Sequence, residues 1–214
     1  MAAEYGWECV TETAAFPGMD GAAALVHDGR MWLLGGWNPR DKVNFPGPPH
    51  GPKDTNSRVY SSRDGETWVL ETAEAPWEGR HTAGAAVHDG RMWILGGDCI
   101  QQRYQPDVWS SRDGINWECA TPHAPWGERI LHMAAAFNGA LYVMGGQSSP
   151  SFGGIATGGG DEVSHADVWR SEDGATWSKV ADSCPWAPRG MISGSAILGG
   201  RMYLLGGGTY ETST

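Results

Sequence analysis

The sequence predicts an all-β protein built from four repeats of a four-stranded sheet, and three observations support this prediction. Glycine (32 of 214 residues), proline (13) and tryptophan (12) are all abundant, which indicates many turns and large aromatic anchors. An apolar segment ending in Gly-Gly occurs four times, with its first glycine at positions 35, 96, 145 and 206. A tryptophan precedes these glycines by 28, 28, 28 and 29 residues, at Trp7, Trp68, Trp117 and Trp177.

The first strand of each repeat is rich in alanine, glycine and serine. It covers residues 21–26, 83–87, 133–137 and 193–197. Strands that converge on one axis need small side chains, so we expect these strands to lie at the centre of the fold. Turn dipeptides of the type I′ hairpin follow at Asp28-Gly29, Asp89-Gly90 and Asn138-Gly139, and Gly199-Gly200 takes the same place in the last repeat.

The second strand of each repeat is apolar at consecutive positions, as in Met92-Trp-Ile-Leu before Gly96-Gly97. This pattern predicts a strand buried on both faces, in the middle of a sheet that packs between two others. The stretch from the second glycine to the next strand varies between 23, 11 and 22 residues, which is typical of a surface loop.

The third strand begins at a valine that is followed by an aromatic residue, at Val59, Val108 and Val168. An Asp-Gly turn then leads to the tryptophan of the fourth strand, nine residues after each valine. Constant spacing indicates hairpins whose register is fixed by their turns.

Four-stranded units repeated along the chain are the blades of a β-propeller. The Gly-Gly doublet, the aromatic residue of strand three, the tryptophan of strand four and the arginines at 80, 129 and 189 together resemble the kelch repeat. The first repeat departs from the pattern, with Gly18-Met19-Asp20 where the arginine is expected. The turns that end at Trp68, Trp117 and Trp177 also resemble the Asp-box of sialidases, shortened by one residue, which implies a turn and no catalytic role.

The predicted fold is therefore a kelch-type propeller of one domain over residues 1–214, or a part of a larger propeller. Its repeats cover approximately 19–72, 80–121, 129–181, and 189–214 together with 4–12, so that the N-terminal strand at Trp7 completes the last blade. Only seven residues follow Gly207, fewer than the shortest loop seen before a third strand. Residues 210–213 could form a compressed third strand, the last blade could have three strands, the chain could be a piece of a larger ring, or two chains could combine into one ring.

Composition and charge exclude several classes of partner. The formal net charge is −10 and the basic residues are scattered, which argues against nucleic acid and anionic membranes. The sequence has neither an 18-residue apolar run nor the pattern of a secretory signal at its start. The four cysteines, Cys9, Cys99, Cys119 and Cys184, show no CxxC spacing and are expected to be free thiols, which predicts a cytoplasmic location.

Candidate site residues fall on one face of the propeller, which we call the loop face because it carries the loops between strands four and one and between strands two and three. Trp77, Trp126 and Trp186 recur at one repeat position, where the first repeat has Phe16. They either pack between blades or form a platform for a sugar or planar ligand. Arg80, Arg129 and Arg189 either tie strands together or form a cationic rim, and Trp37 opens a long loop on this face.

The catalytic candidates are His81 and His132, at the start of first strands, with Glu78 and Glu128 beside them. The stretch from Asp161 to Asp167 holds oxygen and nitrogen donors but lacks the Glu-xxx-Asp-xxx-His iron pattern of kelch nitrile-specifier proteins. The copper site of galactose oxidase has no counterpart here. We therefore expect no metal and no cofactor.

Three functions remain open. The first is a non-catalytic binding module that uses the loop face to hold a protein or carbohydrate ligand. The second is an enzyme of the sugar epimerase or mutarotase type with its site in the central funnel, for which kelch proteins that act on sialic acid are the precedent. The third is a propeller half that assembles, for example as a homodimer through open edges.

Overall fold

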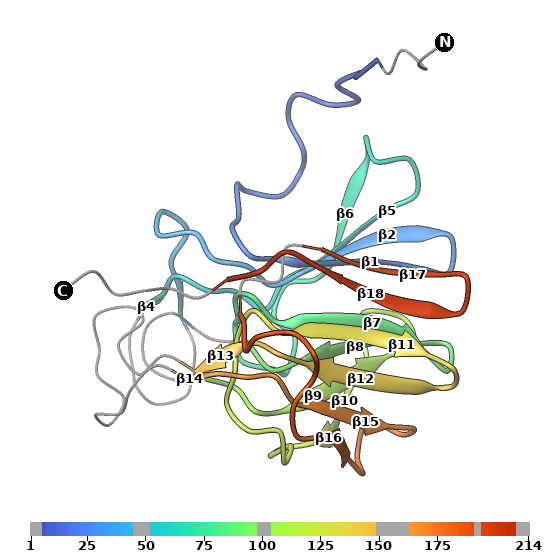
Figure 1. Cartoon of the computed structure of the whole chain (residues 1–214). Coiled ribbons are helices and arrows are strands. Elements are labelled where there is room, and N and C mark those ends of the chain that lie inside the picture. The colour runs from blue at the N-terminus through green and yellow to red at the C-terminus, as the bar shows by residue number, and fades with distance from the viewer. Residues whose placement is uncertain (1–5, 45–51, 98–103, 149–162, 191–193, 209–214) are drawn as a thin grey trace, which may run out of the picture.

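A computed structural model describes residues 6–44, 52–97, 104–148, 163–190 and 194–208, which form strands without any helix (Figure 1). Three antiparallel four-stranded sheets follow one another along the chain, and we call them blades 1 to 3. Blade 1 contains β1 (Ala23–His27), β2 (Arg30–Leu34), β5 (Val59–Ser62) and β6 (Trp68–Thr72). Blade 2 contains β7 (Gly84–His88), β8 (Arg91–Leu95), β9 (Val108–Ser111) and β10 (Trp117–Thr121). Blade 3 contains β11 (Met133–Phe137), β12 (Ala140–Met144), β15 (Val168–Ser171) and β16 (Ser178–Ala181).

Blade 4 has two strands in the described part of the chain, β17 (Gly194–Leu198) and β18 (Arg201–Leu205). Two short hairpins lie in the loops between second and third strands: β3 (Val43–Asn44) with β4 (Pro52–Lys53), and β13 (Gln147–Ser148) with β14 (Val163–Ser164). The predicted all-β, propeller-like architecture is confirmed, and each first strand forms the inner edge of its sheet.

The predicted hairpins between first and second strands are confirmed in all four blades. In blade 2, for example, His88 pairs with Arg91 across the turn. Asp89 and Gly90 have φ angles of 49° and 63°, and a type I′ turn requires positive φ at both central residues.

The Asp-Gly turns between third and fourth strands are held by their own side chains. Ser111 accepts a hydrogen bond from the amide of Gly114, and Asp113 accepts from the amides of Ile115 and Asn116. Partial burial opposes ionisation of Asp113, but these donors outweigh it and lower the pKa of its carboxyl group to about 2. The indole of Trp117 donates to the carbonyl of Gly114, so the tryptophan that ends each turn also fixes it.

Neighbouring blades pack through apolar faces. Trp32, Leu34 and Val59 of blade 1 form one cluster with Met92 and Ile94 of blade 2. A second cluster joins blades 2 and 3 in the same way, and a third joins blade 3 to β18. Successive side chains of a second strand point to opposite faces of the sheet, so one set faces the preceding blade and the other set faces the following blade. This explains why the second strand is apolar at consecutive positions.

Close packing between blades requires glycine in the Asp-Gly turns. A Cβ atom at Gly114 would lie 2.2 Å from the Trp32 ring, and one at Gly174 would lie 2.0 Å from the Trp93 ring. Thr72 and Thr121 each donate a hydrogen bond to the carbonyl of one of these glycines. Each turn is therefore a docking point for the preceding blade.

The N-terminal segment differs from the prediction. Residues 7–11 form no strand, and Trp7 is 101% exposed. Figure 1 shows this segment extending away from the sheets, and blade 4 without outer strands. The physical reason is that a fourth strand pairs with a third, and the described part of blade 4 has no third strand for it to join.

Candidate functional site

Two of the three arginines that open first strands are buried inside the loop face. Arg80 is 1% exposed and Arg129 is 2% exposed. Arg80 donates to both carboxylate oxygens of Asp107, at 2.6 and 3.2 Å, and to the carbonyls of Gly96 and Glu78. Because these bonds occupy the guanidinium group within its own blade, they favour the interpretation of Arg80 as a structural tie over that of a ligand rim.

Arg129 repeats this arrangement with Asp167, the carbonyl of Gly145 and the carbonyl of Trp126. Burial opposes ionisation of Asp167, but hydrogen bonds from Arg129 and Trp169 lower its pKa below the ordinary value. The carboxylate therefore stays charged, and the ion pair persists at neutral pH.

The other two blades depart from this pattern. Blade 1 has Met19 in the place of the arginine and Arg58 in the place of the aspartate, and Arg58 pairs with Asp41 instead. Arg189 of blade 4 donates to the carbonyls of Ala187 and Gly206 and makes no ion pair within the described residues. It is the one arginine of the three that is only half-buried.

The loop tryptophans pack mainly between blades. Trp77 is 0% exposed and Trp126 is 3% exposed. Their rings meet the fourth-strand tryptophans of the next blade edge to face, Trp77 with Trp117 at 5.7 Å and Trp126 with Trp177 at 6.0 Å. Neither ring presents a surface to a ligand, whereas Trp37 and Trp186 are half-buried.

The two histidines at the first strands do not occupy equivalent positions. The repeat position of His81 is held by Asp20 in blade 1, which pairs with Trp37, and by Ile130 in blade 3, which pairs with Gln147. His132 lies two residues beyond this position. His81 lies 3.6 Å from the carboxylate of Asp20. The two imidazoles therefore do not form a symmetric pair.

His132 is enclosed between blades 2 and 3. A Cβ atom at Gly84 would lie 2.8 Å from its Nε2 atom, and its ring lies 5.8 Å from that of Trp126. Burial, together with the nearby Arg129 cation, lowers the pKa of His132 to about 3. The imidazole is neutral at physiological pH and has little contact with solvent, which disfavours acid–base catalysis.

The glutamates predicted beside these histidines separate in the structure. The side chain of Glu78 is buried and that of Glu128 is exposed. The carbonyl of Glu128 accepts a hydrogen bond from Ser148, whose hydroxyl also lies 3.0 Å from Nε2 of His165. Burial, with Arg129 nearby, lowers the pKa of His165 to about 4, so this histidine is also neutral at physiological pH.

A hollow at the loop face lies where the first strands of all four blades begin. A cavity of about 520 Å³ is lined by residues 22–24 of blade 1, 83–85 of blade 2, 132–134 of blade 3, and Gly194 and Ser195 of blade 4. Most of these residues are alanine or glycine, as the composition of the first strands predicts. Each of the four strands is the edge of its sheet, and the outer backbone groups of an edge strand are free to bind other partners.

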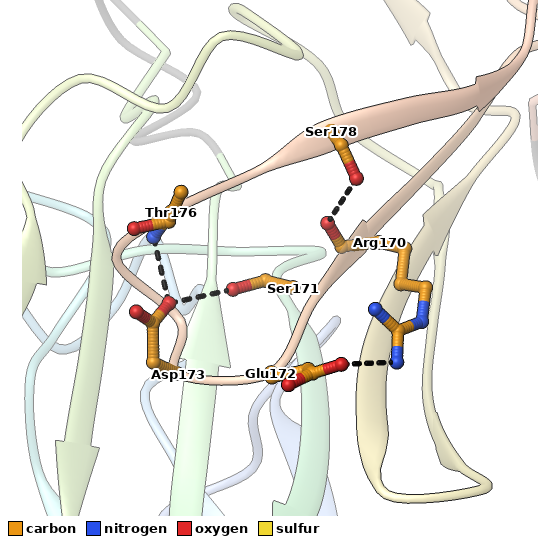
Figure 2. Close-up of a pocket in the computed structure, with 6 residues that line it drawn as sticks. All are labelled: Arg170, Ser171, Glu172, Asp173, Thr176 and Ser178. Carbon is orange, nitrogen blue, oxygen red and sulfur yellow. Dashed lines mark hydrogen bonds and ion pairs between the residues drawn. The ribbon is translucent and has the colours of Figure 1, made fainter.

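A second hollow lies on the opposite face, at the Asp-Gly turn of blade 3 (Figure 2). It measures about 350 Å³ and is lined by Arg170, Ser171, Glu172, Asp173, Thr176 and Ser178. Arg170 is paired with Glu172, and Asp173 is bonded to Ser171 and to the amide of Thr176. The polar groups that line this hollow thus largely hold the turn itself.

Within the described residues, no group of three His, Cys, Asp or Glu side chains could hold a metal ion, and no helix is long and apolar enough to cross a membrane. Cys9, Cys119 and Cys184 are free thiols, while Cys99 lies outside the described residues, as do Asp161 and Glu162 of the donor-rich stretch.

Ser195 and the pair of Ser148 and His165 were not identified as site residues from the sequence. Ser195 could have been identified, because it is a polar residue in one of the small-residue first strands. Ser148 and His165 could not, because nothing in the sequence indicates that two residues 17 positions apart across a loop lie together.

Comparison with known proteins supports the fold. No protein-family model matches the chain, and no curated protein matches it. The solved structure of YjhT matches with a TM-score of 0.69 and 17% sequence identity, over 90% of this chain and 62% of the YjhT chain. This similarity shows a propeller-like fold, and the chain spans less than two thirds of the length of YjhT.

Proposed function

We propose that this chain is a non-catalytic binding module that holds a neutral, hydroxyl-rich ligand of sugar size in the central cavity of the loop face. The observation that carries the proposal is the convergence of four small-residue edge strands on one hollow of about 520 Å³. Ligand sites in proteins commonly measure roughly 300–1,000 Å³.

The lining suits hydroxyl groups. Alanine and glycine side chains leave the backbone accessible, so amides and carbonyls of the edge strands can donate to and accept from a ligand. Ser195 adds an exposed hydroxyl group. The side chain of Asp20 is 74% exposed and precedes the lining of blade 1 by two residues. With a net charge of −10, the chain attracts an anionic ligand poorly, and this favours a neutral carbohydrate.

Binding without catalysis is favoured by the state of the histidines. His132 lines the cavity, but its low pKa and its burial leave it neutral and enclosed. A general acid or base works best with a pKa near the working pH. The same consideration applies to His165, with its pKa of about 4.

The experiment is a titration with a panel of neutral mono- and oligosaccharides, followed by NMR chemical shifts and calorimetry. Ala24 is exposed and lines the cavity, so Ala24→Trp should fill the hollow and weaken binding at least tenfold. Ile115, which is 52% exposed on a turn of the opposite face, provides the matched control Ile115→Trp, which should bind as the parent does. Equal affinity in the two variants, or no binding of any neutral sugar, would refute the proposal.

An epimerase or mutarotase remains the second candidate because of one observation, the approach of His81 to Asp20 at 3.6 Å. A carboxylate beside an imidazole can orient it as a general base. NMR exchange between sugar anomers tests this candidate directly. Acceleration that disappears in Asp20→Asn, while sugar binding persists, would favour the enzyme over the binding module.

A further inference from the structure

One aromatic pair of the repeat is left unmade in this chain. In the other three cases, the aromatic residue of a loop meets a fourth-strand tryptophan edge to face: Phe16 with Trp68 at 5.0 Å, Trp77 with Trp117 at 5.7 Å, and Trp126 with Trp177 at 6.0 Å. The remaining members of the two series are Trp186 and Trp7. Trp7 is 101% exposed, and no described ring stacks on the half-buried Trp186.

The chain spacing around Trp7 is that of a complete repeat. Nine residues separate Trp7 from Phe16, as nine separate Trp68 from Trp77 and Trp117 from Trp126. Phe16 already occupies its place against Trp68 and Tyr60 of blade 1. A blade that received Trp7 would therefore lie directly before blade 1 in the ring.

Blade 4 exposes the surface that a neighbouring segment would cover. Leu198 is 70% exposed, Leu205 is 55% exposed and Tyr203 is 40% exposed. Their counterparts in blade 2 include Trp93 and Leu95, which are buried in the cluster between blades 2 and 3. Blade 4 thus presents an interblade face whose equivalent is covered elsewhere in the same chain.

The chain does not cover this face with its own first blade. On β1, Val26 points away from blade 2 and is 67% exposed, so the two ends of the array remain open. A second copy offers the same two open ends in the complementary order.

We propose that two copies of this chain join end to end, with the segment 7–11 of each copy covering blade 4 of the other and Trp7 stacking on the partner copy's Trp186. In this arrangement a two-fold axis relates the copies, so that the N-terminal segment of each copy meets the open blade 4 of the other and two identical junctions form. Extended segments that add to a free strand edge gain main-chain hydrogen bonds as well as side-chain contacts.

Light scattering on a sizing column tests the proposal on the 214-residue chain over a range of protein concentrations. We expect twice the chain mass of 23.0 kDa. Trp7→Ser on one side of the junction and Leu198→Asp on the other should each give the single-chain mass, and Trp7→Phe should retain the dimer. Both altered side chains are exposed in the single chain, so circular dichroism of the monomeric variants should match that of the parent.

Ile115→Ser is the control, because this exposed residue lies on a turn of blade 2 away from the open ends, and it should remain dimeric. A single-chain mass for the parent at every concentration would overturn the inference. A dimer that survives both Trp7→Ser and Leu198→Asp would place the contact elsewhere and would overturn it equally.

Discussion

The ion pair between Arg80 and Asp107 gives the sharpest prediction about stability. The guanidinium group is buried and makes four hydrogen bonds, two to the carboxylate and two to backbone carbonyls. Asp107 also accepts a hydrogen bond from the indole of Trp109. In Arg80→Met, the carboxylate would keep its charge with only one side-chain donor left.

The magnitude follows from this geometry. Removing one partner of a buried ion pair costs about 3–5 kcal/mol, because the other charge remains without compensation. A chain of this size loses roughly 2–4 °C of melting temperature per kcal/mol, so the expected drop is about 6–20 °C. The double variant Arg80→Met with Asp107→Asn removes both charges, and its cost should be well below the sum of the two single variants.

Blade 1 supports this expectation, because it has Met19 and Arg58 at the equivalent positions and still forms its four-stranded sheet. The assay is urea unfolding followed by circular dichroism, with a complete double-mutant cycle. Arg91→Met is the matched control, since Arg91 pairs with a Glu118 side chain that is 72% exposed, and it should cost less than about 1 kcal/mol. A cost of Arg80→Met as small as that of the control, or strictly additive single variants, would refute the reasoning.

Three further predictions concern packing, protonation and contacts between blades. Gly114→Ala places a Cβ atom against Trp32 at a φ of +74° and should lower the free energy of unfolding by about 2–4 kcal/mol. Gly29 has a similar φ of +65° but open space around it, so Gly29→Ala should cost about 1 kcal/mol. Equal costs in urea unfolding would contradict the packing of Trp32 against the turn. His132 is neutral when folded because its pKa falls from 6.5 to about 3, so the unfolded chain takes up its proton first and stability should decline by about 2 kcal/mol from pH 7 to pH 5. His132→Gln should remove that part of the slope, and an unchanged slope would count against it. Thr121→Val removes hydrogen bonds to two carbonyls of the next blade and should cost about 1–2 kcal/mol in the same assay, while no loss would indicate that these bonds do not hold the blades together.

The sequence by itself determined the strands of the blade sheets and their order, apart from the strand predicted at Trp7. Type I′ dipeptides such as Asp89-Gly90, the Gly-Gly exits and the constant spacing to Trp117 all act through neighbouring residues. Their effect is local, because a turn of two residues fixes the register of the strands on both sides. The all-β class and the four repeats could therefore be predicted before any contact between blades was known.

The tertiary structure alone decided which of the repeated side chains are available to a ligand. Arg80 and Trp77 belong to series that recur along the sequence, as the residues of a surface platform would. Both are buried, because their partners Asp107 and Trp117 lie 27 and 40 residues further along the chain. Trp7 holds the repeat position of the buried Trp117, yet it is fully exposed where the described chain supplies no neighbouring strand. Whether a side chain is buried depends on the residues from distant parts of the chain that pack against it. A periodic sequence shows the same residue pattern in every repeat, whether or not those packing residues are present.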